Sequence, residues 1–186
     1  MSLRDRIVQA ILVVIACLPA GVFSNTVFAE WQHDESDKRQ VKAAEGVQRV
    51  RERLPDTETY FEQAYGYAII PSITRVAIGF GGAYGKGIVV EGDAAVGRTS
   101  YFQFSSGIQL GAKYFSMIVF FKDKQAMDFY KQSEWQFTGQ AGIDLATVGI
   151  SGTPAYSSGV AMFAVTRFGL MGEFSYSGAR FGYKPL

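Results

Sequence analysis

One segment, Gly66–Glu91, constrains the fold of this chain more than any other; it reads GYAIIPSITRVAIGFGGAYGKGIVVE. Between residues 74 and 81, large apolar residues alternate with alanine and glycine, and a period of two predicts a β-strand. A strand face made of small residues indicates that another backbone or layer lies close to it, here at Gly79 and Gly81. The segment therefore predicts a compact, glycine-rich β structure.

The rest of the chain extends this pattern. Of the 21 glycines, only Gly21 and Gly46 precede residue 66, so tight turns and close packing are expected mainly after that point. Residues 114–121 are almost all apolar, which predicts a strand buried on both faces. Strands are expected near 67–70, 74–80, 86–91, 94–105, 107–121, 135–149, 158–167 and 170–183, with a hairpin turn at Gly92 and Asp93.

Three helices are expected beside these strands. Residues 36–54 carry one apolar stripe at helical spacing. Asp56 is a candidate cap of a short second helix that runs to Ala64, and residues 123–132 form a third helix with Asp123 as its N-cap. The predicted fold class is therefore α+β but dominated by strands. We expect a glycine-rich antiparallel sandwich or partly closed barrel with an N-terminal helix and one mid-chain helix.

The N-terminus has the pattern of a secretory leader. A basic start precedes a short apolar run, and Val27-Phe28-Ala29 predicts cleavage before Glu30. The alternative is a lipoprotein signal that ends at Cys17. The expected organisation is a signal peptide at 1–29, a polar linker at 30–37 and a single domain at 38–186.

Catalytic and metal-binding signatures are almost absent from the sequence. The single histidine, His33, lies in the predicted linker, and the single cysteine lies in the predicted leader. A catalytic triad or a His/Cys zinc site in the domain is therefore not expected. Of the carboxylates, only Asp144 and Glu173 interrupt apolar strand patterns, and neither lies in a known catalytic motif. We expect no enzymatic activity, no cofactor and no metal, and the net charge of +1 does not favour nucleic acid as a partner.

The N-terminal helix suggests a different kind of partner. Its apolar stripe includes Val47, Val50 and Leu54, and basic residues border the stripe along one flank. This pattern is typical of a helix in a membrane interface, where cations contact phosphate headgroups and the stripe inserts among acyl chains. The alternative is a helix that packs its stripe on the β core. The predicted headgroup-binding residues are Lys38, Arg39, Lys42, Arg49 and Arg53, and the predicted inserting residues are Val47, Val50 and Leu54.

Several motifs together resemble the SYLF domain, a lipid-binding module of a yeast actin-patch protein, of an animal SH3-containing phosphoinositide binder and of many secreted bacterial proteins. No single motif is diagnostic, and the resemblance rests on their order and spacing over roughly residues 60–183. The motifs are IIPSI at 69–73, GFGGAYGKG at 79–87, the VG turn at 96–97, GIQLGAKYFSMIVFF at 107–121 and FGLMGEFSYSGARF at 168–181.

The resemblance implies a non-catalytic lipid-binding domain of the bacterial secreted branch. An exported protein would meet anionic phospholipid at a membrane surface, in the periplasm or at the outer membrane, and actin is not an expected partner. The alternatives are a small outer-membrane β-barrel or a structural protein of the bacterial envelope. The sequence ends in Lys184-Pro185-Leu186, without the terminal aromatic residue common to such barrels.

Overall fold

A computed structural model describes residues 31–132, 135–140, 156 and 159–186. The predicted leader, including Cys17 and the cleavage site before Glu30, lies outside the described residues, as does Asp144. The elements are α2 (Lys38–Arg53), the 3-10 turn η2 (Pro55–Thr57), α3 (Glu58–Gln63), β1 (Gly66–Glu91), β2 (Ala94–Phe121), α4 (Lys124–Lys131), β3 (Trp135–Gln140) and β4 (Val160–Pro185).

The four strands form one open antiparallel sheet in the order β1-β2-β4-β3. The predicted β-dominated α+β class is confirmed. The predicted hairpin turn is confirmed as well, because Glu91 pairs with Ala94 and Gly92 has a φ of 59°. In the described part of the chain, no helix is both long and apolar enough to cross a membrane.

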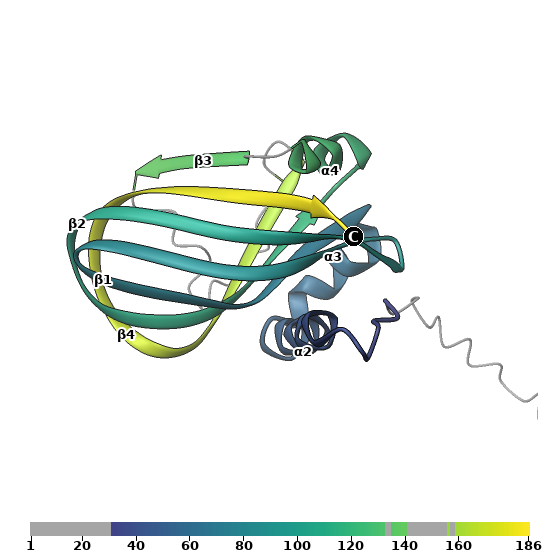
Figure 1. The fold of residues 1–186 in the computed structure, drawn as a ribbon, viewed down its shortest axis with the longest axis horizontal. Helices are drawn as coiled ribbons and strands as arrows, with labels where there is room; N and C mark the ends of the chain where they lie inside the picture. Colours follow the sequence, from purple (N-terminus) through teal and green to yellow (C-terminus); the bar gives the residue numbers. More distant parts are fainter. Residues whose placement is uncertain (1–30, 133–134, 141–155, 157–158) are drawn as a thin grey trace, which may run out of the picture.

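The strands are far longer than the sequence predicts. The segments expected near 67–70, 74–80 and 86–91 are one strand, β1, and the two expected between 94 and 121 are one strand, β2. Figure 1 shows why: β1, β2 and β4 each run out from one end of the molecule, turn over, and run back to the same end. The predicted breaks are places where a strand curves without losing its hydrogen-bonded neighbour.

A bulge at the turning point allows this curvature. Ile78 pairs with Leu110 and Phe80 with Ser106, so the single residue Gly79 in β1 lies opposite three residues of β2. Gly79 has a φ of 70°, which a residue with a side chain rarely adopts. We call this turning region the bend. It divides the sheet into two limbs that face each other across the interior. The first limb contains residues 66–78 of β1 with residues 108–121 of β2, and the second limb contains residues 80–91 of β1 with residues 94–106 of β2.

The two limbs enclose the larger apolar core. The first limb contributes Ile70 and Ile73 from β1 and Met117 and Phe121 from β2. These side chains meet Tyr101, which β2 contributes from the second limb. Helix α4 packs into the same core from the end remote from the bend. It begins at the predicted cap, where the Asp123 carboxylate accepts a hydrogen bond of 2.9 Å from the backbone N–H of Ala126.

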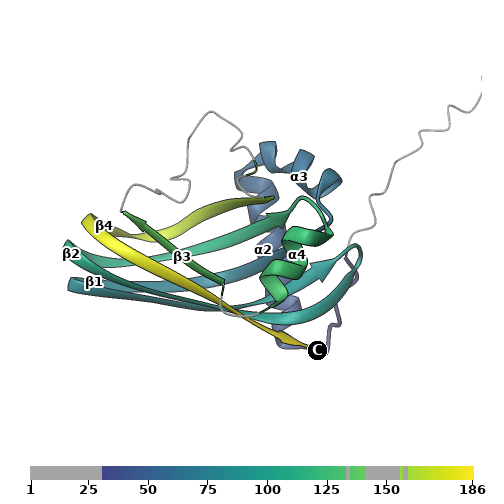
Figure 2. The same ribbon diagram turned by 90° about the horizontal axis from the view of Figure 1, so that it is seen from above.

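A second core lies on the opposite face of the sheet, which we call the outer face. Helices α2 and α3 cover this face near the end remote from the bend (Figures 1 and 2). In residues 115–121 the side chains alternate between the two cores: Met117 and Val119 face the interior, whereas Ile118 and Phe120 lie under the helices. The predicted burial of residues 114–121 on both faces is confirmed from Phe115 onward, whereas Tyr114 is only half-buried.

The predicted close approach is correct for one of the two glycines. A Cβ atom at Gly81 would lie 2.6 Å from the Ser105 Oγ and 2.7 Å from the Cβ of Ala77, so Gly81 allows the interior to close. A Cβ at Gly79 would meet nothing within 4 Å. The role of Gly79 is its backbone angle at the bulge, and its assignment as a packing glycine was wrong.

Neighbouring glycines provide a test of this packing. We expect Gly81→Val to lower the free energy of unfolding by roughly 1–3 kcal/mol, because the new side chain would overfill the interior. Gly82→Val is the matched control: a Cβ there has its nearest neighbour 3.8 Å away, and it points to the outer face. Chemical denaturation of both variants decides the matter, and equal stability of the two would contradict a closed interior at Gly81.

Candidate functional site

Helix α2 presents most of its predicted headgroup-binding cations to solvent. Lys38, Arg39, Lys42 and Arg53 are exposed. Arg49 is different: it is half-buried, and its Nη1 atom donates a hydrogen bond of 3.3 Å to the Ser116 Oγ in β2. The predicted basic flank is therefore present on the helix, except that Arg49 is partly engaged by the sheet.

The apolar stripe of α2 packs inside the protein. Val47 and Val50 are buried in the core under the helix, and Leu54 packs against the same core. Gly46 brings the helix close to the sheet, since a Cβ there would lie 2.8 Å from the Cβ of Pro71. This is the alternative that the sequence left open. In this conformation the three predicted inserting residues stabilise the fold and are not available to a bilayer.

The bend carries the largest exposed apolar surface among the described residues. Opposite residues of an antiparallel pair point to the same face, so Ile78 and Leu110 lie together on the outer face, 76% and 68% exposed. The rings of Phe80 and Phe104 stack with centroids 6.3 Å apart. We call this surface the bend patch; it consists of Val76, Ile78, Phe80, Tyr84, Phe102, Phe104, Ile108 and Leu110, all more than half exposed.

Polarity is inverted at the bend. Behind the patch, the buried Arg75 donates from Nη2 to the Ser105 Oγ (3.2 Å) and to the Gln109 Oε1 (3.3 Å). Gln109 in turn donates from Nε2 to the Gly79 carbonyl oxygen at 2.9 Å. The interior of the bend is therefore a hydrogen-bonded polar network, while the exterior is apolar. Exposed apolar surfaces of this kind are typical of sites that contact other proteins, ligands or membranes.

Negative charge is scarce in the sequence around the bend patch. Residues 66–90 and 94–122 contain no aspartate or glutamate, and β4 contains only Glu173. Lys86 on β1 and Arg167 and Arg180 on β4 are exposed basic residues. The strands around the bend thus combine exposed apolar side chains with an excess of positive charge.

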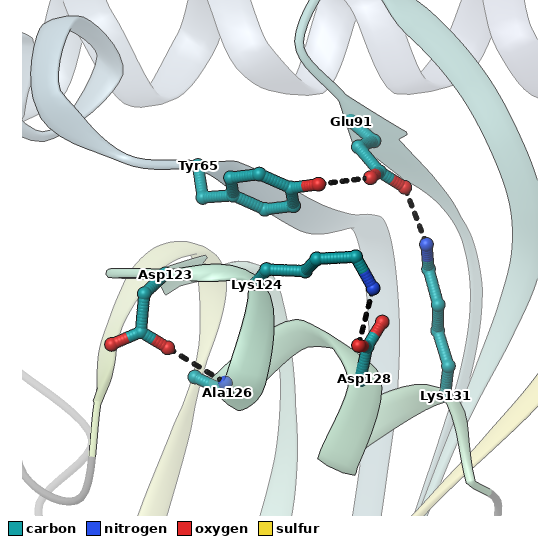
Figure 3. Close-up of polar contacts among 7 residues, drawn as sticks. All are labelled: Tyr65, Glu91, Asp123, Lys124, Ala126, Asp128 and Lys131. Carbon is teal, nitrogen blue, oxygen red and sulfur yellow. Dashed lines mark hydrogen bonds and ion pairs between the residues drawn. The ribbon is translucent and has the colours of Figure 1, made fainter.

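The other cluster of charged groups holds α4 in place (Figure 3). Glu91, at the end of β1, accepts a hydrogen bond of 2.6 Å from the Tyr65 hydroxyl at Oε1 and one of 2.5 Å from the Lys131 Nζ at Oε2. Hydrogen bonds from Lys131 and then Tyr65 hold the pKa of Glu91 below its ordinary value. Both oxygens of the carboxylate are engaged, which suits a structural contact better than acid–base chemistry.

The remaining candidate residues are dispersed. His33 is half-buried and its ring lies beside that of Trp31, with centroids 5.8 Å apart. Within the part of the chain that the structure describes, no three histidine, cysteine, aspartate or glutamate side chains gather as metal ligands would.

The bend patch could not be located from the sequence. The alternation of Val76, Ile78 and Phe80 with small residues is the signal that points to it. The alternation does not say which face is solvent-exposed, because the small residues and Arg75 turn inward only when the strand folds over on itself.

The amino-acid sequence was compared with protein-family models and with known proteins. No family model matches the chain. A protein of Aeromonas veronii named beta cell expansion factor A is 24% identical to it over 136 residues, which are 72% of this chain and 51% of that protein. The chain therefore spans about half of the length of this relative. The match establishes a bacterial relative, whose name describes no biochemical activity.

The contact between α4 and β1 gives a prediction about pH. We expect Glu91→Gln to lower the thermal stability at neutral pH, because the carboxylate binds the Lys131 ammonium. The pKa of Glu91 is lowered by folding, so its contribution is complete above its ordinary pKa of 4.5 and is lost as the pH falls through the lower folded value. The difference in melting temperature between parent and variant should therefore shrink in acid.

A control for this measurement lies on the same helix. Lys124→Gln removes the exposed Lys124–Asp128 ion pair, which should contribute little at any pH. A difference between parent and Glu91→Gln that stays constant from neutral pH to strongly acidic pH would contradict the assigned role of the Glu91 carboxylate.

Proposed function

We propose that this protein is an exported, non-catalytic lipid-binding domain of the SYLF type, which associates peripherally with anionic membrane surfaces in the periplasm or at the outer membrane. The observation that carries the proposal is the bend patch, an exposed apolar surface on strand segments, 66–90 and 94–121, that contain no carboxylate. The SYLF motifs of the sequence, the leader pattern and the match to a bacterial protein support it.

The physical argument rests on the free energy of transfer. Fully burying an aliphatic or aromatic side chain of this size contributes roughly 1.5–3 kcal/mol. Several such side chains lie side by side in the bend patch, where they face water in the isolated protein. A lipid surface removes them from water without requiring a shape-matched partner, and the positive charge nearby favours anionic headgroups.

Serine substitutions in the bend patch test the proposal. We expect the parent to co-sediment with vesicles of phosphatidylcholine and phosphatidylglycerol. The variant Ile78→Ser/Ile108→Ser/Leu110→Ser should lose most of this binding. Its melting temperature should change little, because these three side chains are 76%, 82% and 68% exposed and make few contacts in the fold.

The matched control is Phe129→Ser, which removes a similarly exposed apolar side chain (61%) from α4, away from the bend patch. It should bind vesicles like the parent. Binding of the triple variant at the parental level would contradict the assignment of the patch. The proposal would be overturned by a parent protein that does not bind vesicles but forms a dimer in gel filtration, if the triple variant is a monomer. That result would show that the patch joins two copies of this chain.

A further inference from the structure

Polarity changes in a regular order along the outer face from the bend toward the helices. Nearest the bend are the aliphatic and phenyl side chains of Ile78, Phe80 and Leu110. On the first limb, Thr74 lies four residues from Ile78, and it is aligned across the strands with Tyr114 and Phe168. On the second limb, Tyr84 lies four residues from Phe80, and it is aligned with Phe102. We call each set of residues aligned across the strands a row. Both limbs thus carry a tyrosine at a similar distance from the bend.

Basic side chains lie level with these aromatic rows or one to two residues farther from the bend. Arg180 pairs in register with Phe102, in the same row as Tyr84, and Arg167 precedes Phe168. Lys86 is the next outer-face residue after Tyr84, and its Nζ lies 5.8 Å from the centre of the Tyr84 ring. We call Lys86, Arg167 and Arg180 the collar. The order from the bend is therefore apolar, aromatic, cationic.

This order reproduces the polarity profile of one half of a bilayer. Four residues of extended strand span about 13 Å, close to the roughly 15 Å depth of one hydrocarbon leaflet. Tyrosine favours the boundary between acyl chains and headgroups, and lysine and arginine reach from that level to the phosphates. The polar network behind the patch lies inside the curled strands, so insertion of the bend exposes none of it to acyl chains.

Helix α2 lies too far from the bend to contribute to the same contact. Ile69, which packs under α2, is nine residues from Ile78, or roughly 30 Å of extended strand. Figures 1 and 2 show α2 lying across the strands, away from the end at which they turn over. Charges separated from a surface by more than about 10 Å are largely screened at physiological ionic strength.

On the basis of the proposed membrane association, we infer that the protein docks bend-first into a single leaflet. The aliphatic and phenyl side chains of the bend patch enter the acyl region, Tyr84 and Tyr114 lie at its boundary, and the collar contacts the phosphates of anionic lipid headgroups. The cations of α2 remain in solution. The collar therefore replaces the predicted residues Lys38, Arg39, Lys42, Arg49 and Arg53 as the headgroup-binding site.

Two variants with the same change in charge test this orientation. Lys86→Gln/Arg167→Gln/Arg180→Gln neutralises the collar, and Arg39→Gln/Lys42→Gln/Arg53→Gln neutralises the same number and types of cation on α2. Since each cation near an anionic surface contributes about fivefold in affinity, the collar variant should bind phosphatidylglycerol-containing vesicles at least about tenfold more weakly. The α2 variant should stay within about twofold of the parent. Melting temperatures of both establish that each is folded.

The outcomes separate the inference from the proposed function. A collar variant that binds like the parent, while the serine variant of the bend patch does not bind, would overturn the docking orientation and leave lipid binding in place. A larger loss of vesicle binding for the α2 variant than for the collar variant would overturn the inference and place the headgroup-binding site on α2. A parent that does not bind the phosphatidylglycerol-containing vesicles would overturn both proposals.

A depth measurement provides an independent readout that does not need the charge variants to fold. Tryptophan placed at Phe80, at Tyr84 or at Lys42 should be quenched by lipids brominated on the acyl chain in the order Phe80, Tyr84, Lys42. The signal is read as a difference from the parent, which contains Trp31 and Trp135. Equal quenching at Phe80 and Lys42 would overturn the inference.

Discussion

The bulge at Gly79 is the constraint on which the rest of the structure depends. One residue of β1 opposite three of β2 forces the pair to curve, and the backbone angle of Gly79 accommodates the curvature. Because the strands curve there, their limbs face each other and enclose a core. The same curvature places the outward side chains of the bend at one end of the molecule and the helices toward the other (Figure 2).

The two ends of the sheet consequently bury different kinds of side chain. Remote from the bend, both faces are apolar and both are covered, by α4 on the interior and by α2 and α3 on the exterior. At the bend, the interior is filled by the hydrogen-bonded network around Arg75, and the apolar side chains point outward. A hydrogen-bonded polar interior tolerates an apolar environment outside it, which is the condition that a lipid-facing surface requires.

Local signals in the sequence predicted local structure well. The Asp123 cap, the turn at Gly92 and the burial of residues 115–121 on both faces each depend on near neighbours, and each is confirmed. The continuity of β1 was not predictable in the same way, because a glycine bulge within a strand has the same composition as a turn between two strands. The exposure of Ile78 depends on which way the strand curls, a property of the whole sheet. The docking of Val47 and Val50 likewise depends on a sheet surface formed by distant segments.

The pairing of β2 with β4 also determines how this fold must assemble. The hairpin of β1 and β2 closes through a two-residue turn, whereas Gly97 pairs with Pro185 across almost half of the chain. Contacts between such distant residues close slowly, because the intervening chain must first lose its conformational freedom. Until β4 arrives, Met117 and Val119 on one face and Ile118 and Phe120 on the other lack their partners from that strand. A chain that has formed only the hairpin of β1 and β2 would therefore expose, on both faces, apolar side chains that β4 covers in the folded domain.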